Sequence, residues 1–383
     1  MATIDAAPAD TADRTVAAAM AEAASAWLDA LDPDQRARAQ WAGPADDEAA
    51  EAERLRWFYT PTDHGGLPLN AQRPAQQSLA MQLLASGLST AGYVTVATVM
   101  GLENVLDHVE GFGVGWGRER GRDPGLYYLR VFGNPRSGHT WGWRFGGHHV
   151  SLNNLVVDGR VRAMTPCFLG ADPAAAPLLG AGVLRPLGTA EDLAREIVRS
   201  LSPLLQARAV LLDRAPSDIV GGNRSRISDG DEMMRLPEIW RGRFTEPSLA
   251  NRLDGMSERA EAASGYSEAD HARLALRAQP RGLPATELNG DQRELLRTLL
   301  AAYTGRVPDG LAEPVELDAV HLAWAGSVEP GQPHYYRLQA TGLLIEWDNT
   351  QRGANHAHSV WRNPDTDFGV DALAAHLAVH HSG

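Results

Sequence analysis

The stretch LLIEWDNTQRGANHAHSVWR, residues 343–362, decides the fold, because it combines two strand-like runs with much of the chain's polar chemistry. Side chains alternate between the two faces of a strand, so the apolar side chains of the first run share one face. Glu346 and Asp348 share the opposite face. Two carboxylates on a strand that buries apolar residues need a metal, an arginine or a ligand beside them, unless that face is solvated.

The second run contains a His-x-His motif, formed by His356 and His358. On a strand both imidazoles point the same way and form a two-point clamp for a metal, since imidazole is the commonest protein metal ligand. The alternative is a pair of partly buried histidines that hydrogen-bond to backbone and carboxylate groups.

A second histidine pair, His148 and His149, lies in the run WGWRFGGHHVSLNN, residues 141–154, which is strand-like throughout. Adjacent residues on a strand face opposite sides, so one of the two is expected to join the site. A bulge at the glycines Gly146 and Gly147 would re-aim the chain and change that expectation. The sequence does not decide between the two histidines.

Arginines and nearby polar residues complete the predicted site. Guanidinium groups suit a substrate carboxylate or phosphate, and they suit the strand carboxylates equally well. The catalytic candidates are Glu346, Asp348, Arg144 and Arg362, and the substrate-binding candidates are Arg337, Asn153 and Trp143. His64 lies on a glycine-rich loop and is expected to face solvent.

Outside these motifs, the pattern predicts an α+β fold with a mostly antiparallel sheet, flanking helices and an N-terminal helical layer. Apolar residues recur at helical spacing in four long segments and at strand spacing in several others. Asp158-Gly159 between two short apolar runs predicts a β-hairpin. The expected helices span residues 15–31, 72–84, 88–109 and 293–303, and further strands span residues 127–132, 319–325 and 334–339.

The chain is predicted to form a single α+β domain over residues 14–383, after a disordered tail over residues 1–13 that is rich in Ala, Asp and Pro. One internal echo exists, between LDPDQR at residues 31–36 and LNGDQR at residues 288–293. Both look like helix starts, so the echo is interpreted as shared capping chemistry and not as a duplication.

Composition limits the partners that the protein can have. The net charge of −13 repels nucleic acid and anionic membranes at long range, so neither is expected as a partner. The uncharged run at residues 83–102 is interrupted by glycines and hydroxyl residues and is expected as a buried helix pair. A single cysteine, Cys167, permits no intrachain disulfide and fits a cytoplasmic location.

Several of these motifs together resemble the domain-of-unknown-function 3500 family. They are FGNP at residues 132–135, GHHVSLN at 147–153, EWDNTQ at 346–351 and NHAHSVWR at 355–362. The resemblance covers roughly residues 15–380. It implies one full-length domain and no particular activity. One departure is Gly146, where an acidic residue often stands in the family pattern.

The leading hypothesis is a metal-dependent enzyme, a hydrolase of a small organic substrate. His356, His358, one of His148 and His149, and a strand carboxylate would bind a divalent metal, zinc or iron. An alternative is a non-haem iron or copper oxidoreductase. Another is a non-catalytic protein that binds a small acidic ligand through its arginines, and in a third the histidines are structural. The metal hypotheses require the two histidine segments to meet in space.

Overall fold

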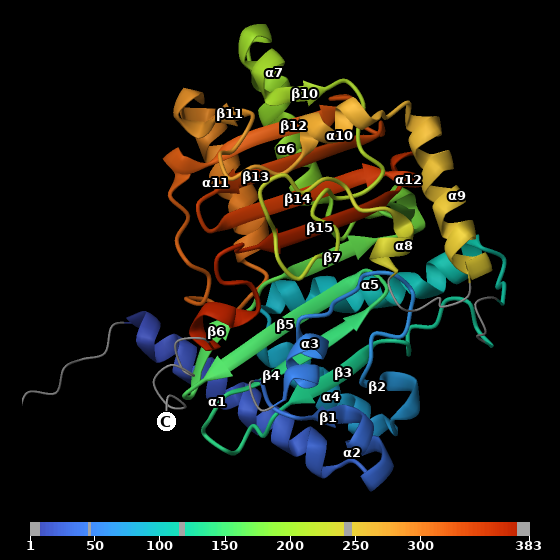
Figure 1. Ribbon diagram of the computed structural model, residues 1–383, viewed down its shortest axis with the longest axis vertical. Coiled ribbons are helices and arrows are strands. Elements are labelled where there is room, and N and C mark those ends of the chain that lie inside the picture. The colour runs from blue at the N-terminus through green and yellow to red at the C-terminus, as the bar shows by residue number, and fades with distance from the viewer. Residues whose placement is uncertain (1–7, 45–46, 115–118, 241–246, 374–383) are drawn as a thin grey trace, which may run out of the picture.

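The computed structural model describes residues 8–44, 47–114, 119–240 and 247–373, and a large twisted sheet forms its centre (Figure 1). Its strands run in the order β1-β3-β4-β5-β7-β15-β14-β13-β12-β10, and off this path β2 pairs with β3, β6 with β5 and β11 with β12. The strands are β1 (Gln40–Trp41), β2 (Leu67–Pro68), β3 (Tyr128–Phe132), β4 (Trp141–Gly147), β5 (Val150–Val157), β6 (Arg160–Ala163), β7 (Cys167–Ala171), β10 (Val210–Leu212), β11 (Leu283–Pro284), β12 (His321–Gly326), β13 (His334–Ala340), β14 (Leu343–Thr350) and β15 (His356–Arg362).

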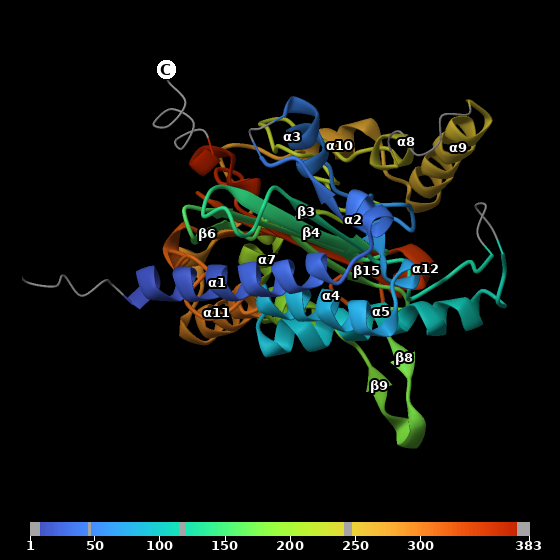
Figure 2. The ribbon, with the colours of Figure 1, turned by 90° about the horizontal axis from the view of Figure 1, so that it is seen from below.

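Long helices cover one face of the sheet, and short helices with irregular segments cover the other (Figure 2). The first layer contains α1 (Pro8–Asp29), α4 (Pro74–Ser86), α5 (Thr90–Val109), α6 (Gly188–Ser200), α7 (Pro203–Ala209) and α11 (Gly290–Thr304). The second contains α3 (Glu48–Arg54), α8 (Leu236–Ile239), α9 (Pro247–Ser264) and α10 (Glu268–Leu274), while α2 (Pro33–Ala39) and α12 (Gln351–Ala354) lie at the sheet margin. The main apolar core lies between the sheet and the long helices.

The α+β prediction with a mostly antiparallel sheet is confirmed. Among the described strands, only the pairs β1–β3 and β10–β12 are parallel. The predicted hairpin forms between β5 and β6, where Asp158 and Gly159 both adopt the positive φ that such a turn requires. Ser89 accepts a hydrogen bond from the Gly92 amide and starts α5.

Three predictions about element boundaries change. The strand predicted over residues 141–154 is two strands, because His148 and His149 form a two-residue turn between β4 and β5. The first helix begins at Pro8, inside the segment predicted to be disordered; residues 1–7 lie outside the described residues. The sequence pattern also predicts a C-terminal helix over residues 370–380, and this segment lies mostly outside the described residues. None of the described helices is both long and apolar enough to cross a membrane.

The sheet is made of two halves with the same plan, a duplication that the sequence analysis did not predict. In the first half, Gln40 of β1 lies parallel to Val131 of β3, and Leu67 of β2 lies opposite Leu129. The second half repeats both pairings with corresponding residues, which are Val210 beside Trp324 and Leu283 opposite Leu322. The helices repeat too, since α1 packs on α4 as α6 packs on α11.

Glycine conformation supports the correspondence between the halves. Gly66 and Gly282 each precede a Leu-Pro strand and have φ of +111° and +102°. A Cβ at Gly66 would lie 2.6 Å from the Leu129 carbonyl oxygen, and one at Gly282 would lie 2.2 Å from that of Leu322. The similar sequences at residues 31–36 and 288–293 lie at the starts of α2 and α11. These two helices do not occupy equivalent places in the two halves, so the similarity reflects shared capping.

The two halves meet along β7 and β15, which pair antiparallel in the middle of the sheet. Cys167 pairs with Trp361 at the end of this seam. The strand order on either side mirrors itself, so the halves are related by an approximate two-fold axis perpendicular to the sheet. Among the described strands, those of the first half pair with those of the second half only at this seam.

Candidate metal centre

Three histidines converge at one end of the seam between the halves. The Nε2 atom of His149 lies 2.8 Å from that of His356 and 3.3 Å from that of His358, and the last two are 3.1 Å apart. His149 comes from the β4–β5 turn, and the other two come from the same face of β15. The two histidine segments thus meet, as the metal hypotheses required.

The turn settles which residue of the first pair joins the cluster. His149 has φ of +64°, in the left-handed region that favours glycine. The corresponding turn in the second half, between β13 and β14, has Gly342 at this position with φ of +68°. Gly170 on β7 leaves the space for the imidazole, since a Cβ there would lie 2.8 Å from Cδ2 of His149. A histidine in a glycine conformation is a costly choice that points to a functional constraint.

Carboxylates orient two of the three imidazoles. Asp218 Oδ1 lies 2.8 Å from Nδ1 of His358, so this nitrogen donates and Nε2 keeps its lone pair toward the cluster. The hydroxyl of Tyr59 donates to the other oxygen of Asp218 at 2.9 Å. Asp172 lies 3.6 Å from Nδ1 of His356 and is held in turn by Arg352 at 3.0 Å.

The environment favours neutral imidazoles. Burial is the main cause that holds the pKa of His149 and the pKa of His356 well below the usual range, and the neighbouring imidazoles add to it. A neutral imidazole is the form that binds metal. The side chain of His356 keeps 13% of its surface exposed, so solvent reaches the cluster from that side.

His148 stacks on His149 with ring centroids 3.8 Å apart, and one ligand atom each of His148, His149 and His356 lie within 4.8 Å of one another, so His148 borders the triangle as a fourth histidine. Its Nδ1 lies 2.5 Å from Oε1 of Glu103, a buried carboxylate on α5. The backbone carbonyl of His148 also accepts a hydrogen bond from the Tyr127 hydroxyl at 2.8 Å. The histidine–carboxylate pair is therefore fixed from both sides, beside the cluster.

Asp348 lies directly opposite His358 on β14, on the face that carries Asp218. It is fully buried, and neither of its oxygens has a hydrogen-bond partner among the described residues. Burial, and then the charge of Asp218, raise the pKa of Asp348 well above the usual range. An unpartnered buried carboxyl is costly, so it marks this face of the cluster as the place where a proton or a cation is needed.

Glu346, the other predicted carboxylate, has a different environment. Its oxygens accept hydrogen bonds from the Val220 amide at 2.8 Å, from the Gly221 amide at 3.0 Å and from the Tyr335 hydroxyl at 2.8 Å. Burial raises the pKa of Glu346. Its partners within the described part of the chain do not include the three histidines, and it anchors the segment that carries Asp218.

The arginines predicted for the site contact separate segments. Arg144 donates to Glu53 and to the His64 carbonyl, and Arg362 donates to Asp367 at 2.6 Å. Arg337 donates to the Leu274 carbonyl at 3.0 Å, while its Nε and Nη2 have no partner among the described residues. The three guanidinium groups do not converge on one ligand position.

Arg144 and Arg337 occupy equivalent positions in the two halves. Arg144 on β4 lies opposite Asn153, as Arg337 on β13 lies opposite Glu346. Each arginine binds backbone carbonyls of the segment that precedes β2 or β11. The duplicated plan thus explains both of them as anchors of the overlying segments.

Asn153, Trp143 and His64 also lie away from the histidine cluster. Asn153 donates to the Pro166 carbonyl at 3.3 Å. Trp143 packs in the core on the opposite face of the sheet, against Gly87 of the helical layer. The expectation that His64 faces solvent is wrong, because it is buried, bonds to the Thr60 carbonyl at 2.9 Å and stacks on an aromatic ring.

Sequence reasoning missed three carboxylates that contact the histidines. Glu103 carried a signal, since it lies seven residues after Val96 and four after Val99, on the apolar face of α5. Asp218 lies in an irregular segment and Asp172 follows the end of β7, so no periodicity singles them out. Their role follows only from the packing of distant segments.

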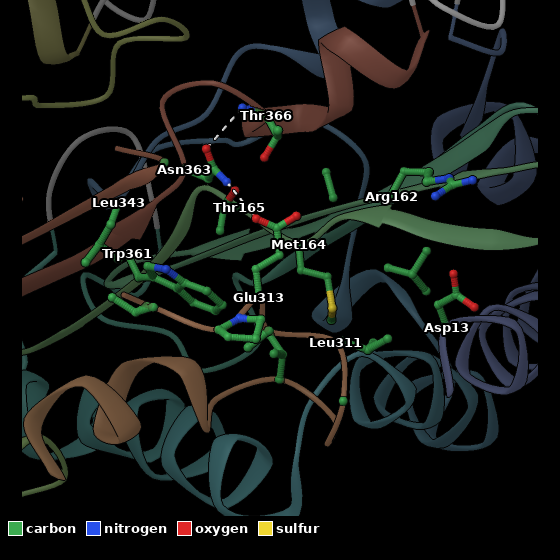
Figure 3. A pocket seen from close by; sticks show the side chains of 18 of the residues that line it. Asp13, Arg162, Met164, Thr165, Leu311, Glu313, Leu343, Trp361, Asn363 and Thr366 are labelled. Atoms are coloured by element: carbon green, nitrogen blue, oxygen red, sulfur yellow. Dashed lines mark hydrogen bonds between the residues drawn. The ribbon is translucent and has the colours of Figure 1, made fainter. Parts of the chain in front are cut away.

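A cavity of about 810 Å³ lies at the opposite end of β14 and β15 from the histidines (Figure 3). Its lining includes Trp361, Met164, Leu311, Ala163 and Gly342. None of the described residues that line it is a histidine, and it belongs to the region that the two-fold axis relates to the histidine cluster. We therefore place the candidate chemistry at the cluster and not in this cavity.

Comparison with known proteins gives one match. The family model described as "Protein of unknown function (DUF3500)" matches residues 13–370, nearly the whole chain. No curated protein and no solved structure gives a significant match.

Proposed function

We propose that this chain, which belongs to the DUF3500 family of proteins of unknown function, is a metal-dependent enzyme that hydrolyses a small organic substrate. The observation that carries the proposal is the triangle of Nε2 atoms of His149, His356 and His358, with sides of 2.8 to 3.3 Å. Hydrogen bonds between neighbouring imidazoles have the same distances, so the metal content of the protein decides between the two interpretations.

The donor set fits a metal ion of the size of zinc. Zinc–nitrogen bonds of about 2.0–2.1 Å with tetrahedral angles separate two nitrogen ligands by about 3.3 Å. The observed triangle is close to that spacing. Three histidines also leave a fourth position free, which is the arrangement of catalytic zinc sites.

Asp218 is the residue that prepares His358 for this role. Its carboxylate fixes the imidazole tautomer through Nδ1, which is the usual outer contact of a metal-binding histidine. Tyr59 holds Asp218 in place. Glu346 supports the same segment from behind through the Val220 and Gly221 amides.

A divalent metal at this position would act as a Lewis acid and lower the pKa of a bound water. His148 is the group placed to move the proton, because Glu103 holds its Nδ1 and the ring lies against His149. A base oriented by a third group is the recurring arrangement for such a transfer.

The oxidoreductase alternative keeps two supporting observations. All three converging atoms are imidazole nitrogens, a set that copper accepts as readily as zinc. Asp172 and Asp218 face the Nδ1 atoms of His356 and His358, whereas Asp348 has a ligand atom within 4.8 Å of one on His358. A site that adds this one carboxylate to the histidines would suit iron, so the metal identity decides between the alternatives.

The test is the metal content of the purified protein, measured by elemental mass spectrometry after reconstitution with zinc, iron, copper or manganese. We expect close to one metal per chain in the wild type and loss of that metal in His356→Ala and His358→Ala. His139→Ala, on an exposed turn, is the matched control and should keep the metal.

The hydrolytic part is tested separately with a panel of small esters, amides and lactones. His148→Ala should keep the metal and lose turnover. If reconstitution loads no metal into the wild type, the metal-dependent enzyme is abandoned; if copper loads and the protein consumes oxygen, the oxidoreductase replaces the hydrolase.

A further inference from the structure

A hairpin between β7 and α6 projects from the body of the protein. None of the side chains in this hairpin is polar. Residues 173–184 read PAAAPLLGAGVL and contain β8 (Ala176–Pro177) and β9 (Val183–Leu184). Figure 2 shows the hairpin projecting beyond the layer of long helices. Leu179 at its tip is 101% exposed, and Leu178 is more than half exposed. Soluble proteins rarely present such a contiguous apolar surface unless it binds something.

A small depression lies at the root of the same hairpin, lined mostly by apolar residues and also by Thr95, Thr189 and Arg306. Its volume is about 210 Å³, and small side chains from α5 and α11 dominate its wall. Truncation of a buried leucine to alanine leaves a cavity on the order of 150 Å³, so the depression has room for one leucine side chain. Its lining includes Ala91, Gly92, Leu187, Ala301 and Ala302.

The α5 side of the depression carries no charge. Residues 90–102 of α5 contain no charged side chain, although the chain carries a net charge of −13. Val94 is more than half exposed, and a Cβ at Gly101 would meet no atom within 4 Å. A second acidic molecule can approach this face without bringing like charges together.

We propose that two copies of this chain form a two-fold dimer by exchanging these hairpins, with Leu179 of each copy seated in the partner's depression. Two hairpins that lie side by side and antiparallel place each tip at the root of the other. The contact between hairpin tip and depression then occurs twice, related by the two-fold axis, and no further copy can be added.

Stable interfaces begin at roughly 1,200 Å² of buried surface, which is the area that the two hairpins and the facing α5 helices would have to bury. The acidic net charge of the chain argues against an anionic membrane as the occupant.

The variants belong at the tip and in the depression, not at the root. The Ala174 amide donates to the Asn355 carbonyl at 3.0 Å, and the Ala175 amide donates to the Asn355 side chain at 2.7 Å. Asn355 precedes His356, so changes at the root would disturb the histidine cluster. Leu179 and Ala91 avoid this.

The experiment is sedimentation velocity of the full chain at low micromolar concentration. We expect a dimer for the wild type and monomers for Leu179→Asp and Ala91→Arg, with the dissociation constant raised by roughly 100-fold or more. Leu204→Asp is the matched control, because Leu204 on α7 is 75% exposed but lies outside the proposed contact. It should remain dimeric.

An equimolar mixture of the two monomeric variants sharpens the test. It retains one native tip-to-depression contact, and in the second contact the carboxylate introduced by Leu179→Asp meets the guanidinium introduced by Ala91→Arg in the other chain. The mixture should therefore recover dimers. A monomeric wild type, a dimer that survives Leu179→Asp, or a wild type that floats with phosphatidylglycerol vesicles while monomeric in solution would each overturn the proposal.

Discussion

The two ends of the central seam follow one backbone plan, yet only one of them carries the histidine cluster. Asp348 lies opposite His358 at one end, and Leu155 lies opposite Ala163 at the equivalent place in the other half. His149 and Gly342 occupy the same left-handed turn position. The comparison teaches that both halves have the same backbone arrangement. Different residues at a few positions make one of the two places a candidate metal centre.

The comparison also separates scaffold from site. Features that occur in both halves, such as the buried arginines Arg144 and Arg337, belong to the scaffold. Features that occur once, such as the carboxylate contact of His358, belong to the candidate site. The predictions below test that division, beginning with the scaffold.

The largest effect is expected at the paired glycines. Gly66→Ala and Gly282→Ala should each lower the free energy of unfolding by on the order of 3 kcal/mol or more, because a Cβ would meet a backbone carbonyl at a positive φ. Urea denaturation measures both. Gly138→Ala, where a Cβ meets nothing, should cost far less. A large loss at one glycine and none at the other would break the equivalence of the halves.

The next effect concerns the outer contact of His358. Asp218→Asn should weaken metal binding by roughly 10- to 100-fold, because the amide no longer fixes the imidazole tautomer. Competition with a chromophoric chelator gives the affinity. Glu103→Gln, the same change beside His148, should leave the affinity unaltered. Equal losses in the two variants would show that His148 is a ligand and that the triangle is misassigned.

The pH dependence of stability should change at Asp348. Its pKa is raised in the folded protein, so the folded state holds the proton above the ordinary value of 3.8 at which the unfolded state releases it. The metal-free wild type should therefore lose stability as pH rises from about 4, by up to about 1.4 kcal/mol per pH unit.

Asp348→Asn should remove that loss. The free energy of unfolding of the variant, relative to that of the wild type, should therefore rise toward neutral pH. Denaturation curves between pH 4.5 and pH 7.5 (roughly the window set by the ordinary carboxyl pKa) measure the difference. The exposed Asp365→Asn is the control and should follow the wild type. Parallel curves for the wild type and Asp348→Asn would mean that the carboxyl has no raised pKa in the fold.

The smallest effect compares the two turns. Gly342→His should cost about 1 kcal/mol, because it introduces a side chain at φ of +68°. His149→Gly, the reverse exchange at the equivalent turn, should cost less in the metal-free protein while abolishing metal binding. Chemical denaturation gives both values. A larger cost for His149→Gly would assign His149 a packing role that the other turn lacks.

The sequence alone predicted the fold class and both histidine segments, because alternating apolar residues and His-x-His spacing are local signals. It did not identify His149 over His148, since that depended on a turn inside a run that looks like one strand. Asp218 escaped because it reaches His358 from an irregular segment 140 residues away. The duplication was not predicted because the repeated sequence that the two halves share here is short, namely Gly-Leu-Pro at residues 66–68 and 282–284.

The seam between β7 and β15 has a consequence for the order of folding. Cys167 and Trp361 are separated by about 190 residues, whereas the hairpins within each half join neighbouring segments, and pairings so distant in sequence form slowly. Each half can therefore close its own hairpins first. His149 comes from one side of this seam, and His356 and His358 come from the other. The three imidazoles thus meet only at a late step. The rate of metal uptake in a refolding experiment would therefore report the rate at which the two halves join.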